Sequence, residues 1–410
     1  MTLLAIIADD LTGAADAAAP FASQGFSTTI SFGDALSDSD VLACSTESRD
    51  RDRQTAARES RRAAHRISAR CAPPGPRWIY TKIDSALRGH PREELLAVMS
   101  ARGAAKALVA AALPAETRTT IGGRQYIAGM PLETSDLASP GATSDLTALF
   151  DLPAGTVRSL NLATVREGIE AVREFLGRVT HGIVVADAEH DADLLTLAGA
   201  AINSDFCVLC GSAGFARQLA FVLPLVPSGQ ASGVTYHKKG PVLIIAGSQH
   251  QATAAQVEVV HQSGIPVVCL GQKHIDDPAA AVNDAVDEVA HHLAGGHSAV
   301  LTTLGLDPSV QGAEFVVACL AEFVIEPNIY RHLGGLVLTG GDVAAGVLAG
   351  IGSTVFHLRG EIRPAMPWGI VESALLPPLP VATKAGSFGT EDALQACLAY
   401  LEGLGSTSTD

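Results

Sequence analysis

The sequence has no long hydrophobic run, although 47% of its 410 residues are hydrophobic. Its apolar segments are short and interrupted by glycine, whereas a transmembrane helix needs about 20 consecutive apolar residues. We therefore expect no membrane-spanning segment and no membrane partner. The N-terminus also lacks the basic region of a secretory signal peptide and begins directly with a predicted strand, so we expect no such signal.

Positive charge is scarce as well, because the formal net charge is −15 at pH 7. Binding of nucleic acid requires clustered lysine and arginine, so we do not expect nucleic acid as a partner. Arginines do gather between Arg49 and Arg70, but alanines interleave with them at helical spacing and acids interrupt the charge. A solvated amphipathic helix explains this segment better than a nucleic-acid surface.

Cysteines are few, odd in number and scattered mostly within apolar runs, at Cys44, Cys71, Cys207, Cys210, Cys269, Cys319 and Cys397. This distribution favours reduced thiols and a cytoplasmic location over a disulfide framework. Cys207 and Cys210 have C-x-x-C spacing, but a strand would point them to opposite faces and no second Cys/His pair lies nearby. The histidines form no H-E-x-x-H motif. The sequence thus identifies no metal ligands.

Short apolar segments alternate with helical segments through both halves of the chain. This alternation predicts an α/β fold with largely parallel sheets, and the length predicts two domains. A Pro/Gly/Ser stretch from Pro224 to Gly233, followed by Lys238 and Lys239, places the boundary between domains 1–230 and 238–410. The irregular segment 113–150, rich in Thr, Gly and Pro, is predicted to be a loop that covers a site or is mobile.

Buried strands are predicted wherever apolar residues run together. They are expected at 3–7, 27–32, 40–44, 77–81, 107–112, 182–186, 206–210, 242–246, 265–270, 298–303 and 335–339. Helices are expected at about 13–24, over the Arg/Ala segment, from Pro91, after Ser248 to about Ser263, and at the C-terminus.

Two adjacent carboxylates, Asp9 and Asp10, follow the first predicted strand, and a Thr12-Gly13 turn comes next. Ligands of open α/β sheets bind at the carboxyl ends of the strands. A helix cap by Asp10 or Thr12 is the structural alternative, but one cap leaves the second carboxylate unexplained. We therefore interpret this strand end as the floor of a catalytic site.

Lys82, Asp84, Ser85 and Arg88 lie within seven residues after another predicted strand. Alternation along the strand end would put Lys82 and Asp84 on one face. Basic groups suit the carboxylate of a small anionic substrate, and hydroxyl and carboxylate groups suit its alcohols. A surface salt bridge plus a cap is the alternative for any single residue. Since Arg49 also stands at a strand end, the group as a whole favours binding.

Glycine-containing turns recur in the second half, at Ser248, at Gly340–Asp342 and at Gly386–Gly389. Gly340-Gly341-Asp342 between a strand and a helix would present backbone amides to a phosphate. Neither a P-loop nor a full G-x-G-x-x-G is present. The alternatives are a cap by Asp342 and a capping box of Ser248 with Gln251.

The acid-rich segment from Asp187 to Asp193 resembles a cation loop. It lacks the mid-loop glycine and the distal glutamate of an EF-hand. An acid-rich helix start is the better interpretation, and a secondary part in the substrate cleft is the alternative.

Taken together, these motifs resemble the four-carbon acid sugar kinase family. The segments that carry the resemblance occur in family order over nearly the whole chain. They are Ala8-Asp9-Asp10-Leu11-Thr12-Gly13-Ala14 with Asp16, Lys82-Ile83-Asp84-Ser85 with Leu87-Arg88-Gly89, Asp187-Ala188-Glu189 with Asp191-Ala192-Asp193, Gly211-Ser212-Ala213-Gly214, Thr339-Gly340-Gly341-Asp342, and Lys384-Ala385-Gly386 with Phe388-Gly389.

The resemblance implies a sugar-acid-binding first domain, a nucleotide-binding second domain and an active site in the cleft between them. It implies ATP-dependent phosphorylation of the 4-hydroxyl of D-threonate, D-erythronate or a 3-oxo-tetronate, with Mg²⁺. Substrate contacts are expected at Asp9, Asp10, Arg49, Lys82, Ile83, Asp84, Ser85 and Arg88. Nucleotide contacts are expected at Ser248, Gly340, Gly341, Asp342, Val343, Gly386, Ser387 and Gly389.

The chain departs from the family pattern at two places. Ala86 stands where Thr is common, and Leu113-Pro114-Ala115-Glu116-Thr117-Arg118 is an altered version of a Phe-Pro…Gly-Arg segment. These departures concern the choice of sugar acid more than the reaction.

Phosphoryl transfer needs positioning, charge neutralisation and a base near the attacking hydroxyl. Asp10 is the candidate base, and Asp84 is the second candidate. Lys82 with Arg88 or Arg49 would hold the substrate carboxylate. Amides of the glycine turns would hold the phosphates, with Mg²⁺ bridging them, and closure of a hinge would exclude water.

Two other functions compete with the kinase. A nicotinamide-dependent sugar-acid oxidoreductase would need a G-x-G-x-x-G after its first strand and an acid about 20 residues further on, and neither is evident. A non-catalytic sugar-acid-binding protein is the other alternative. A homodimer is expected only as a common default.

Overall fold

The computed structural model describes residues 2–33, 36–70, 75–152, 156–224, 234, 236, 240–270, 278–304 and 313–404. The chain forms two compact units, Met1–Ile30 with Leu36–Ala231, and Ser31–Ala35 with Ser232–Asp410. Each unit is a sheet covered by helices, so the predicted α/β class is confirmed. Cys71, Lys238 and Lys239 lie outside the described residues.

The first unit is built on a sheet in which the strands run in the order β2-β3-β1-β4-β11-β5-β10-β9. Pairing is parallel from β3 through to β9. The strands are β1 (Leu4–Ala8), β2 (Thr28–Ser31), β3 (Val41–Ser45), β4 (Trp78–Lys82), β5 (Lys106–Ala110), β9 (Val157–Leu160), β10 (Gly182–Ala186) and β11 (Val208–Gly211).

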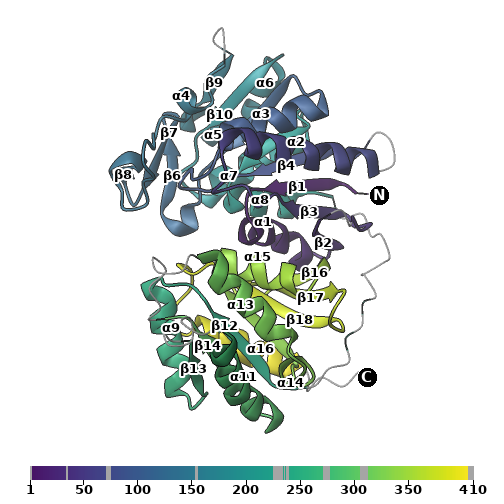
Figure 1. Cartoon of the computed structure of the whole chain (residues 1–410). Coiled ribbons are helices and arrows are strands. Elements are labelled where there is room, and N and C mark those ends of the chain that lie inside the picture. The colour runs from purple at the N-terminus through teal and green to yellow at the C-terminus, as the bar shows by residue number, and fades with distance from the viewer. Residues whose placement is uncertain are drawn as a thin grey trace. The chain divides into compact units, whose positions relative to one another are not determined.

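Helices of the first unit connect these strands and cover the sheet (Figure 1). They are α1 (Leu11–Ser23), α2 (Arg53–Arg70), α3 (Pro91–Arg102), α4 (Leu146–Leu149), α5 (Leu162–Arg166), α6 (Ile169–Gly177), α7 (Asp191–Ile202) and α8 (Ala213–Val222). The Arg/Ala segment is a helix, and Pro91 opens α3 at its first turn, both as predicted.

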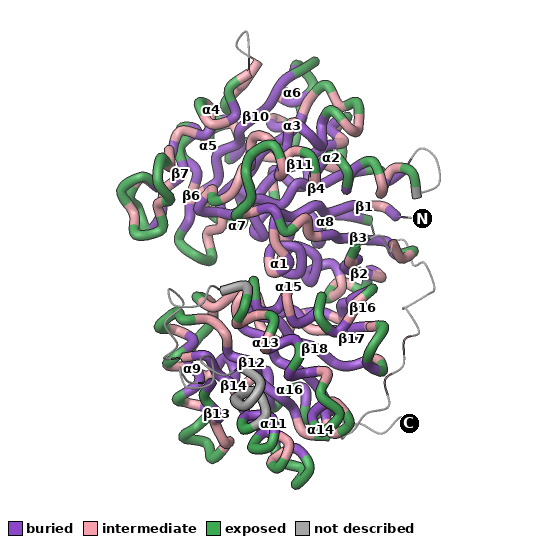
Figure 2. The backbone as a smooth tube through the Cα atoms, viewed as in Figure 1, coloured by how far each residue is buried: buried purple, intermediate pink, exposed green. Residues whose placement is uncertain are grey.

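The strands of the first unit are continuous apolar runs in the sequence because they are buried in its core. Every residue of β1, β4 and β10 is buried (Figure 2). Ile7 of β1 packs in one cluster with Ile67 of α2 and Val98 of α3, and α1 packs against α8. Strands covered by helices have no polar face, so period-two alternation is absent.

Segment 113–150 is not the loop that its composition predicts. It contains η1 (Pro114–Glu116), β6 (Arg118–Ile121), β7 (Arg124–Ile127), β8 (Met130–Pro131), η2 (Leu132–Thr134) and α4. β6, β7 and β8 form a separate antiparallel sheet. The usual burial of apolar side chains and exposure of polar ones is reversed at these positions, because Thr120 and Gln125 are fully buried while Ile121 is 38% exposed. The alternation of apolar and polar residues therefore does not identify these strands.

The second unit is a sheet in the order β13-β14-β12-β15-β18-β17-β16. Pairing is parallel from β13 to β18 and antiparallel between β18, β17 and β16. The strands are β12 (Val242–Ala246), β13 (Val267–Cys269), β14 (Ala299–Thr302), β15 (Gly335–Thr339), β16 (Ser353–Glu361), β17 (Pro367–Ser373) and β18 (Leu379–Lys384). The β16–β17 pair was not predicted.

Helices of the second unit are α9 (Gln251–Gln262), α11 (Pro278–Ala294), α13 (Ala313–Ile325), α14 (Pro327–Tyr330), α15 (Gly341–Gly350) and α16 (Ala393–Leu404). Val260 of α9 and Leu398 of α16 share a core cluster with Ile244 of β12. Among the residues that the structure describes, no helix has the length and apolarity needed to cross a bilayer.

Candidate active site

The polar residues singled out in the first half meet at one edge of the first sheet. Ala8 of β1 is in register with Ser45 of β3 on one side and Lys82 of β4 on the other. All these pairings are parallel, so the segments that follow the three strands leave the sheet side by side. This arrangement brings together, as predicted, Asp9 and Asp10, the loop that carries Arg49, and the loop 83–90.

Arg49 forms ion pairs with both Asp9 and Asp10. Its Nε lies 2.8 Å from Asp9 Oδ2 and its Nη2 lies 2.7 Å from Asp9 Oδ1. Its Nη1 donates to Asp10 Oδ2. The guanidinium therefore neutralises two neighbouring carboxylates with all three of its nitrogens.

Asp10 is also the N-cap of α1. Its Oδ1 accepts from the Gly13 amide at 2.7 Å, and its Oδ2 accepts from the Thr12 hydroxyl at 2.8 Å. The capping alternative is thus correct for Asp10 and does not apply to Thr12. The Asp10 side chain is 15% exposed and that of Asp9 is 1% exposed, so Asp10 is the carboxylate that solvent can reach.

Burial dominates the electrostatics of Asp9. Loss of hydration raises the pKa of Asp9, although the Arg49 charge and hydrogen bonds act in the opposite direction. For Arg49, burial would lower the pKa, but the charges of Asp10 and Asp9 outweigh it and hold the pKa above its usual range. Asp9, Asp10 and Arg49 therefore form one cluster in which a single guanidinium pairs with two carboxylates.

Glycines let the surrounding loops approach this cluster. A Cβ atom on Gly13 would lie 2.4 Å from Asp10 Oδ1 and 3.3 Å from Lys82 Nζ. A Cβ atom on Gly89 would lie 2.8 Å from Asp9 Oδ2, and Gly89 also has a φ of +82°. Both positions therefore exclude a side chain.

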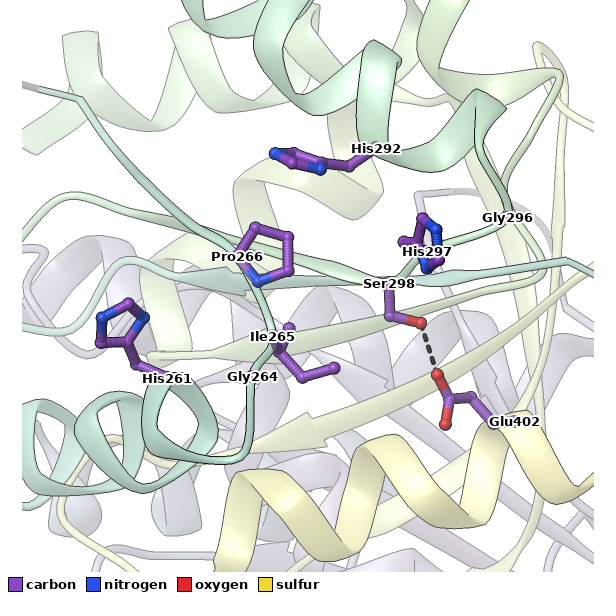
Figure 3. Close-up of a pocket in the computed structure, with 9 residues that line it drawn as sticks. All are labelled: His261, Gly264, Ile265, Pro266, His292, Gly296, His297, Ser298 and Glu402. Atoms are coloured by element: carbon purple, nitrogen blue, oxygen red, sulfur yellow. Dashed lines mark hydrogen bonds between the residues drawn. The ribbon is translucent and has the colours of Figure 1, made fainter.

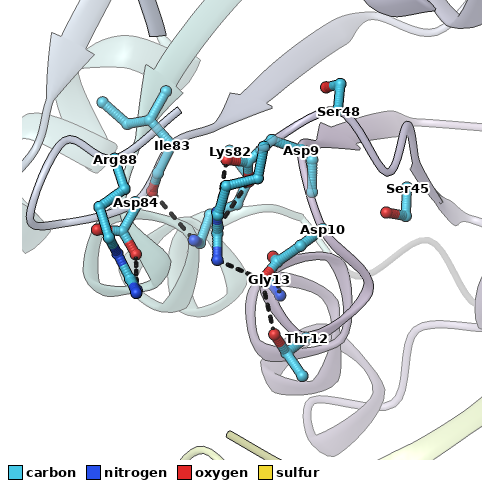
Figure 4. A network of polar contacts seen from close by, with 12 residues as sticks. Asp9, Asp10, Thr12, Gly13, Ser45, Ser48, Lys82, Ile83, Asp84 and Arg88 are labelled. Carbon is cyan, nitrogen blue, oxygen red and sulfur yellow. Dashed lines mark hydrogen bonds and ion pairs between the residues drawn. The ribbon is translucent and has the colours of Figure 1, made fainter. Parts of the chain in front are cut away.

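The loop after β4 is pinned by its own side chains. Lys82 ends β4 and donates to the Ile83 carbonyl at 3.0 Å. Asp84 accepts from the Ala86 amide at 2.8 Å and from Arg88 Nη2 at 2.6 Å, as the paired side chains in Figure 4 show. The salt bridge of the structural alternative is therefore present, but Asp84 is buried and caps a turn, because the next helix begins only at Pro91.

The strand-alternation argument for Lys82 and Asp84 does not apply, because β4 ends at Lys82 and Asp84 lies in the following turn. Burial alone would raise the pKa of Asp84, yet the hydrogen bond and charge of Arg88 outweigh it, with smaller contributions from Arg49 and Lys82. The pKa of Asp84 is therefore held below its usual range.

Two polar residues of the antiparallel sheet were missed and lie against Ser85. Arg118 Nη1 donates to the Ser85 hydroxyl, and Gln125 Nε2 donates to the Ser85 carbonyl at 2.8 Å. Arg118 is 8% exposed and Gln125 is fully buried. The altered Gly-Arg segment of the family pattern was the signal that could have identified Arg118.

Glu94 is a buried carboxyl that the sequence did not reveal. It is 2% exposed, and its Oε1 accepts from the Ser48 hydroxyl at 3.4 Å. Burial and the Asp9 charge raise the pKa of Glu94 to about 8. An acid in the first turn of a helix usually serves the helix dipole, so the sequence carried no hint of its burial.

Two acids of the segment from Asp187 to Asp193 have structural roles, and one of them confirms the predicted acid-rich helix start. Asp187 accepts from the amides of Gly122 and Gly123, both at 2.8 Å. Asp193 closes a capping box at the start of α7. In the part of the chain that the structure describes, no three metal-ligating side chains form a metal site, and the cysteines that it describes are free.

In the second unit, the turns after β12, β15 and β18 converge on Ser248. A Cβ atom on Gly386 would lie 2.0 Å from Ser248 Oγ, and one on Gly340 would lie 3.4 Å from Ser248 Cβ. The Thr253 hydroxyl of α9 donates to the Gly386 carbonyl at 2.9 Å. Three segments that are remote in sequence thus form one glycine-lined surface.

Both capping alternatives for these turns are wrong. His250, not Ser248, is the N-cap of α9, and its ring accepts from the Ala252 amide. Gly340, with a φ of +104°, is the N-cap of α15, and Asp342 stands in the first turn. The amides of Gly341, Asp342 and Val343 thus lie at the positive end of the α15 dipole.

The turn after β18 is folded around two buried donors that sequence reasoning missed. Lys384 Nζ donates to the carbonyls of Ala385 at 2.7 Å and Phe388 at 2.9 Å. Gln256 Nε2 donates to the carbonyls of Phe388 and Gly389 at 3.0 and 3.2 Å. Burial lowers the pKa of Lys384 to about 8. The segment holding Ser387 is thereby fixed in shape.

A pocket of about 460 Å³ lies elsewhere in the second unit (Figure 3). It is lined by His261, His292, His297, Ser298 and Glu402 among others, and Ser298 donates to Glu402 at 2.5 Å. Ile265 and Ser298 precede β13 and β14, whereas the glycine turns follow strands. Because the strands are parallel, this pocket is at the opposite edge of the sheet from the turns.

Family models match both units. A model described as a sugar-binding N-terminal domain matches residues 4–219, and one described as a nucleotide-binding C-terminal domain matches residues 243–394.

Curated relatives match nearly the full length. A D-threonate kinase of Cupriavidus necator is 34% identical, with 95% of each chain covered. A D-threonate kinase of Salmonella typhimurium is 30% identical over 97% of this chain and 98% of the relative. A D-erythronate kinase of Heliobacterium modesticaldum is 30% identical over 98% of this chain and 97% of the relative.

Solved structures share the fold. A Salmonella typhimurium protein described as a putative tRNA synthase superposes with a TM-score of 0.81 at 22% identity, covering 97% of this chain and 99% of that one. A Haemophilus influenzae protein superposes with a TM-score of 0.73 at 22% identity, covering 98% and 100%. At this identity the likeness establishes the fold alone. Together with the family models and the full-length relatives, these findings show that the chain belongs to the four-carbon acid sugar kinase family, whose members are phosphotransferases acting on an alcohol group.

Proposed function

We propose that this protein transfers the γ-phosphoryl group of ATP to the 4-hydroxyl of a four-carbon sugar acid, giving the 4-phosphate and ADP. D-Threonate is the first acid to test, because three relatives at 30–34% identity are D-threonate kinases. D-Erythronate and 3-oxo-tetronate follow, on relatives at 30% and 28% identity.

One observation carries the proposal. The acid- and base-rich residues converge in the unit matched by the sugar-binding model, and the glycine turns converge in the unit matched by the nucleotide-binding model. A kinase needs both surfaces, whereas a non-catalytic sugar-acid-binding protein needs only the first. The expectation of an active site between the two units stays a prediction.

Asp10 is the proposed base. Its carboxylate is the more exposed of the adjacent pair, and Arg49 and the α1 amide of Gly13 hold it in one orientation. A general base must reach the proton of the attacking hydroxyl, which favours Asp10 over buried Asp9. We assign Asp84 a role in holding the acceptor, because Arg88 is hydrogen-bonded to its carboxylate and holds its pKa below the usual range.

The remaining residues of the first unit would bind the acid. The segment that includes Asp84 offers further donors and acceptors for the hydroxyl groups of the acid. They belong to Lys82, Ile83, Ser85 and Arg88. Asp9 would act through Arg49, because its own carboxylate is buried and paired. Water exclusion by a closing motion would prevent hydrolysis of ATP.

In the second unit, the amides of Gly340–Val343 would bind phosphate at the N-terminus of α15. Ser248, Gly386, Ser387 and Gly389 would border the nucleotide. Mg²⁺ is typically held by one or two carboxylates plus substrate phosphates, and Asp342 in the first turn of α15 suits such a site. When bound there, Mg²⁺ would neutralise charge on the phosphates.

The test is release of ADP from ATP and Mg²⁺ in the presence of D-threonate, D-erythronate, 3-oxo-tetronate and the neutral tetritols. We expect ADP with at least one acid and none with the tetritols. Absence of ADP with every acid would remove the kinase proposal. Reduction of NAD⁺ by an acid would revive the oxidoreductase alternative.

We also propose that the enzyme is cytoplasmic and has no nucleic-acid partner. We propose that it forms a homodimer, which light scattering would test.

A further inference from the structure

The side chain of Lys384 is enclosed by the turn that follows β18. Lys384 is 1% exposed, and its Nζ donates to the carbonyl oxygens of Ala385 at 2.7 Å and Phe388 at 2.9 Å. Lysine is rarely buried completely, because its charge loses hydration there. These carbonyl oxygens replace water around the ammonium, and the ammonium in turn holds them toward the interior of the protein.

Two buried side chains of α9 hold further carbonyls of the same turn. The Thr253 hydroxyl donates to the Gly386 carbonyl at 2.9 Å. Gln256 Nε2 donates to the carbonyls of Gly389 and Thr390 at 3.2 and 3.1 Å. Thr253 is fully buried and Gln256 is 1% exposed. The turn is therefore attached to the interior through its carbonyl oxygens, by donors from both β18 and α9.

Peptide geometry then determines where the amides of this turn point. In a planar trans peptide, the C=O of one residue and the N–H of the next point in opposite directions. The amides of Gly386, Ser387 and Gly389 each follow a carbonyl that faces the buried donors, so they point to the opposite side of the turn. Within the described part of the chain, these three amides have no hydrogen-bond partner, and Ser387 and Gly389 are exposed.

The outward amides belong to the glycine-lined surface around Ser248. A Cβ atom on Gly386 would lie 2.0 Å from Ser248 Oγ, and one on Gly340 would lie 3.4 Å from Ser248 Cβ. Gly340 is the N-cap of α15. Amides of a turn that point to one side form a concave site for an anion such as phosphate. The turn after β18 and the start of α15 can therefore bind one chain of phosphates together.

We propose that Lys384 and Gln256 are positioning residues that shape the turn after β18 for the phosphates of ATP. By holding the carbonyls inward they present the amides outward, and neither side chain contacts the nucleotide itself. This inference rests on the proposed function, because it assumes that the glycine turns bind a nucleotide. A lysine at a phosphate site usually acts as a point charge on the phosphate, whereas the charge of Lys384 is used within the protein.

A buried ammonium makes this arrangement sensitive to pH. Burial lowers the pKa of Lys384 to about 8, and the Cys397 thiol of α16, whose own pKa is raised to about 12, opposes this shift. Arg363, which faces Cys397, is paired with Asp392. The neighbouring strand β15 has no titratable side chain, and the two α9 donors do not titrate. As pH rises through about 8, the ammonium loses a proton and its charge, so affinity for ATP should fall.

The experiment measures, by calorimetry, the affinity of Lys384→Met, Gln256→Leu and Lys106→Met for a non-hydrolysable ATP analogue with Mg²⁺. Lys106, the control, is a lysine of β5 in the first unit that donates to the Val179 carbonyl at 2.8 Å. We expect the first two variants to raise Kd roughly 10- to 100-fold, because amides that bind a charged phosphate lose their orientation. Kd for D-threonate should stay unchanged in both, and Lys106→Met should match the wild type.

The pH profile separates positioning from a structural effect. In the wild type, Kd for the analogue should rise roughly three- to tenfold from about pH 7 to about pH 9. Gln256→Leu should keep this rise, whereas Lys384→Met should lose it. A wild-type Kd that is independent of pH, a rise that persists in Lys384→Met, or an unchanged affinity in either variant would overturn the inference. If Lys384→Met does not fold, the wild-type profile and the affinity of Gln256→Leu decide in the same way.

Nucleotide binding by the wild type distinguishes the inference from the proposed function. A wild type that binds the analogue but releases no ADP with any acid contradicts the kinase proposal, while weaker binding in Lys384→Met still supports the inference. A wild type that binds no nucleotide contradicts both. An active wild type together with unchanged affinity in Lys384→Met contradicts the inference alone.

Discussion

Asp9 and Asp10 are neighbours in the chain, but their carboxylates meet different surroundings. Asp9 is enclosed and paired with Arg49, whereas Asp10 caps α1 and keeps contact with solvent. Sequence reasoning identified both residues and preferred Asp10. It could not predict that Arg49 joins them, because that contact depends on how the ends of β1 and β3 meet in the sheet.

Replacement of Asp10 by Asn tests the proposed base. Asn caps helices as well as Asp does, so α1 should remain intact. Turnover should fall by roughly 10²- to 10⁴-fold, because the amide cannot accept the proton. Steady-state kinetics with D-threonate would measure this, and titration with ATP should show unchanged affinity. Near-normal turnover would exclude Asp10 as the base.

Replacement of Arg49 by Met should destabilise the protein by about 3–5 kcal/mol, because the buried Asp9 loses its counter-charge. Urea unfolding gives the free energy. Arg58→Met is the control, since Arg58 is a surface arginine of α2 paired with Glu59. The double variant Asp9→Asn/Arg49→Met should recover part of the loss. A change as small as that in Arg58→Met would contradict the buried pair.

Because the carboxyl of Glu94 is buried, we expect the free energy of unfolding to depend on pH. The pKa of its carboxyl is raised to about 8 from 4.5. Between these values the folded state retains a proton that the unfolded state has lost, so the free energy of unfolding falls as pH rises through this window. Burial raises the pKa of Asp9 as well, which acts with the same sign.

Urea midpoints measured from about pH 5 to about pH 8 should decline more steeply in the wild type than in Glu94→Gln. Glu170→Gln, at an exposed position of α6, should behave as the wild type. Equal slopes in Glu94→Gln and the wild type would show that Glu94 is not the group responsible.

At the scale of the element, prediction succeeded where hydrophobicity was continuous. The central parallel strands, such as β1, β12 and β15, lie close to their expected positions because helices cover both faces of each sheet. It failed for β6–β8, where Thr120 and Gln125 are buried and Ile121 is exposed. The β16–β17 hairpin was missed too, since no turn motif or alternation was recognised there.

The glycine turns of the second unit could be located from the sequence, but their meeting point could not. Ser248 is close to both Gly340 and Gly386 only because β12, β15 and β18 follow one another in the sheet. The order of strands in a sheet is a long-range property that local patterns do not contain.

Replacement of Gly386 by Ala should weaken ATP binding roughly tenfold or more, because the added Cβ atom would lie 2.0 Å from Ser248 Oγ and push the turns apart. Gly403→Ala, where a Cβ atom meets nothing within 4 Å, is the matched control in the same unit. Isothermal titration with a non-hydrolysable ATP analogue provides the affinity. Unchanged affinity in Gly386→Ala would contradict a nucleotide contact at these turns.

At the scale of the whole molecule, the chain combines two α/β units matched by a sugar-binding and a nucleotide-binding family model. Composition, length and strand pattern predicted the fold class. The order of motifs along the chain predicted the family. The identity of the acid was not predictable, because in the proposed site it would depend on the positions of a few polar atoms around Asp10 and Ser85.

The most direct measurement of the central claim is phosphorus–proton NMR of the product formed from ATP, Mg²⁺ and D-threonate. The account predicts one phosphate monoester whose phosphorus couples to the methylene protons at C4, formed together with an equal amount of ADP. A phosphate on C2 or C3, or the absence of a phosphate ester with every four-carbon acid, would contradict it.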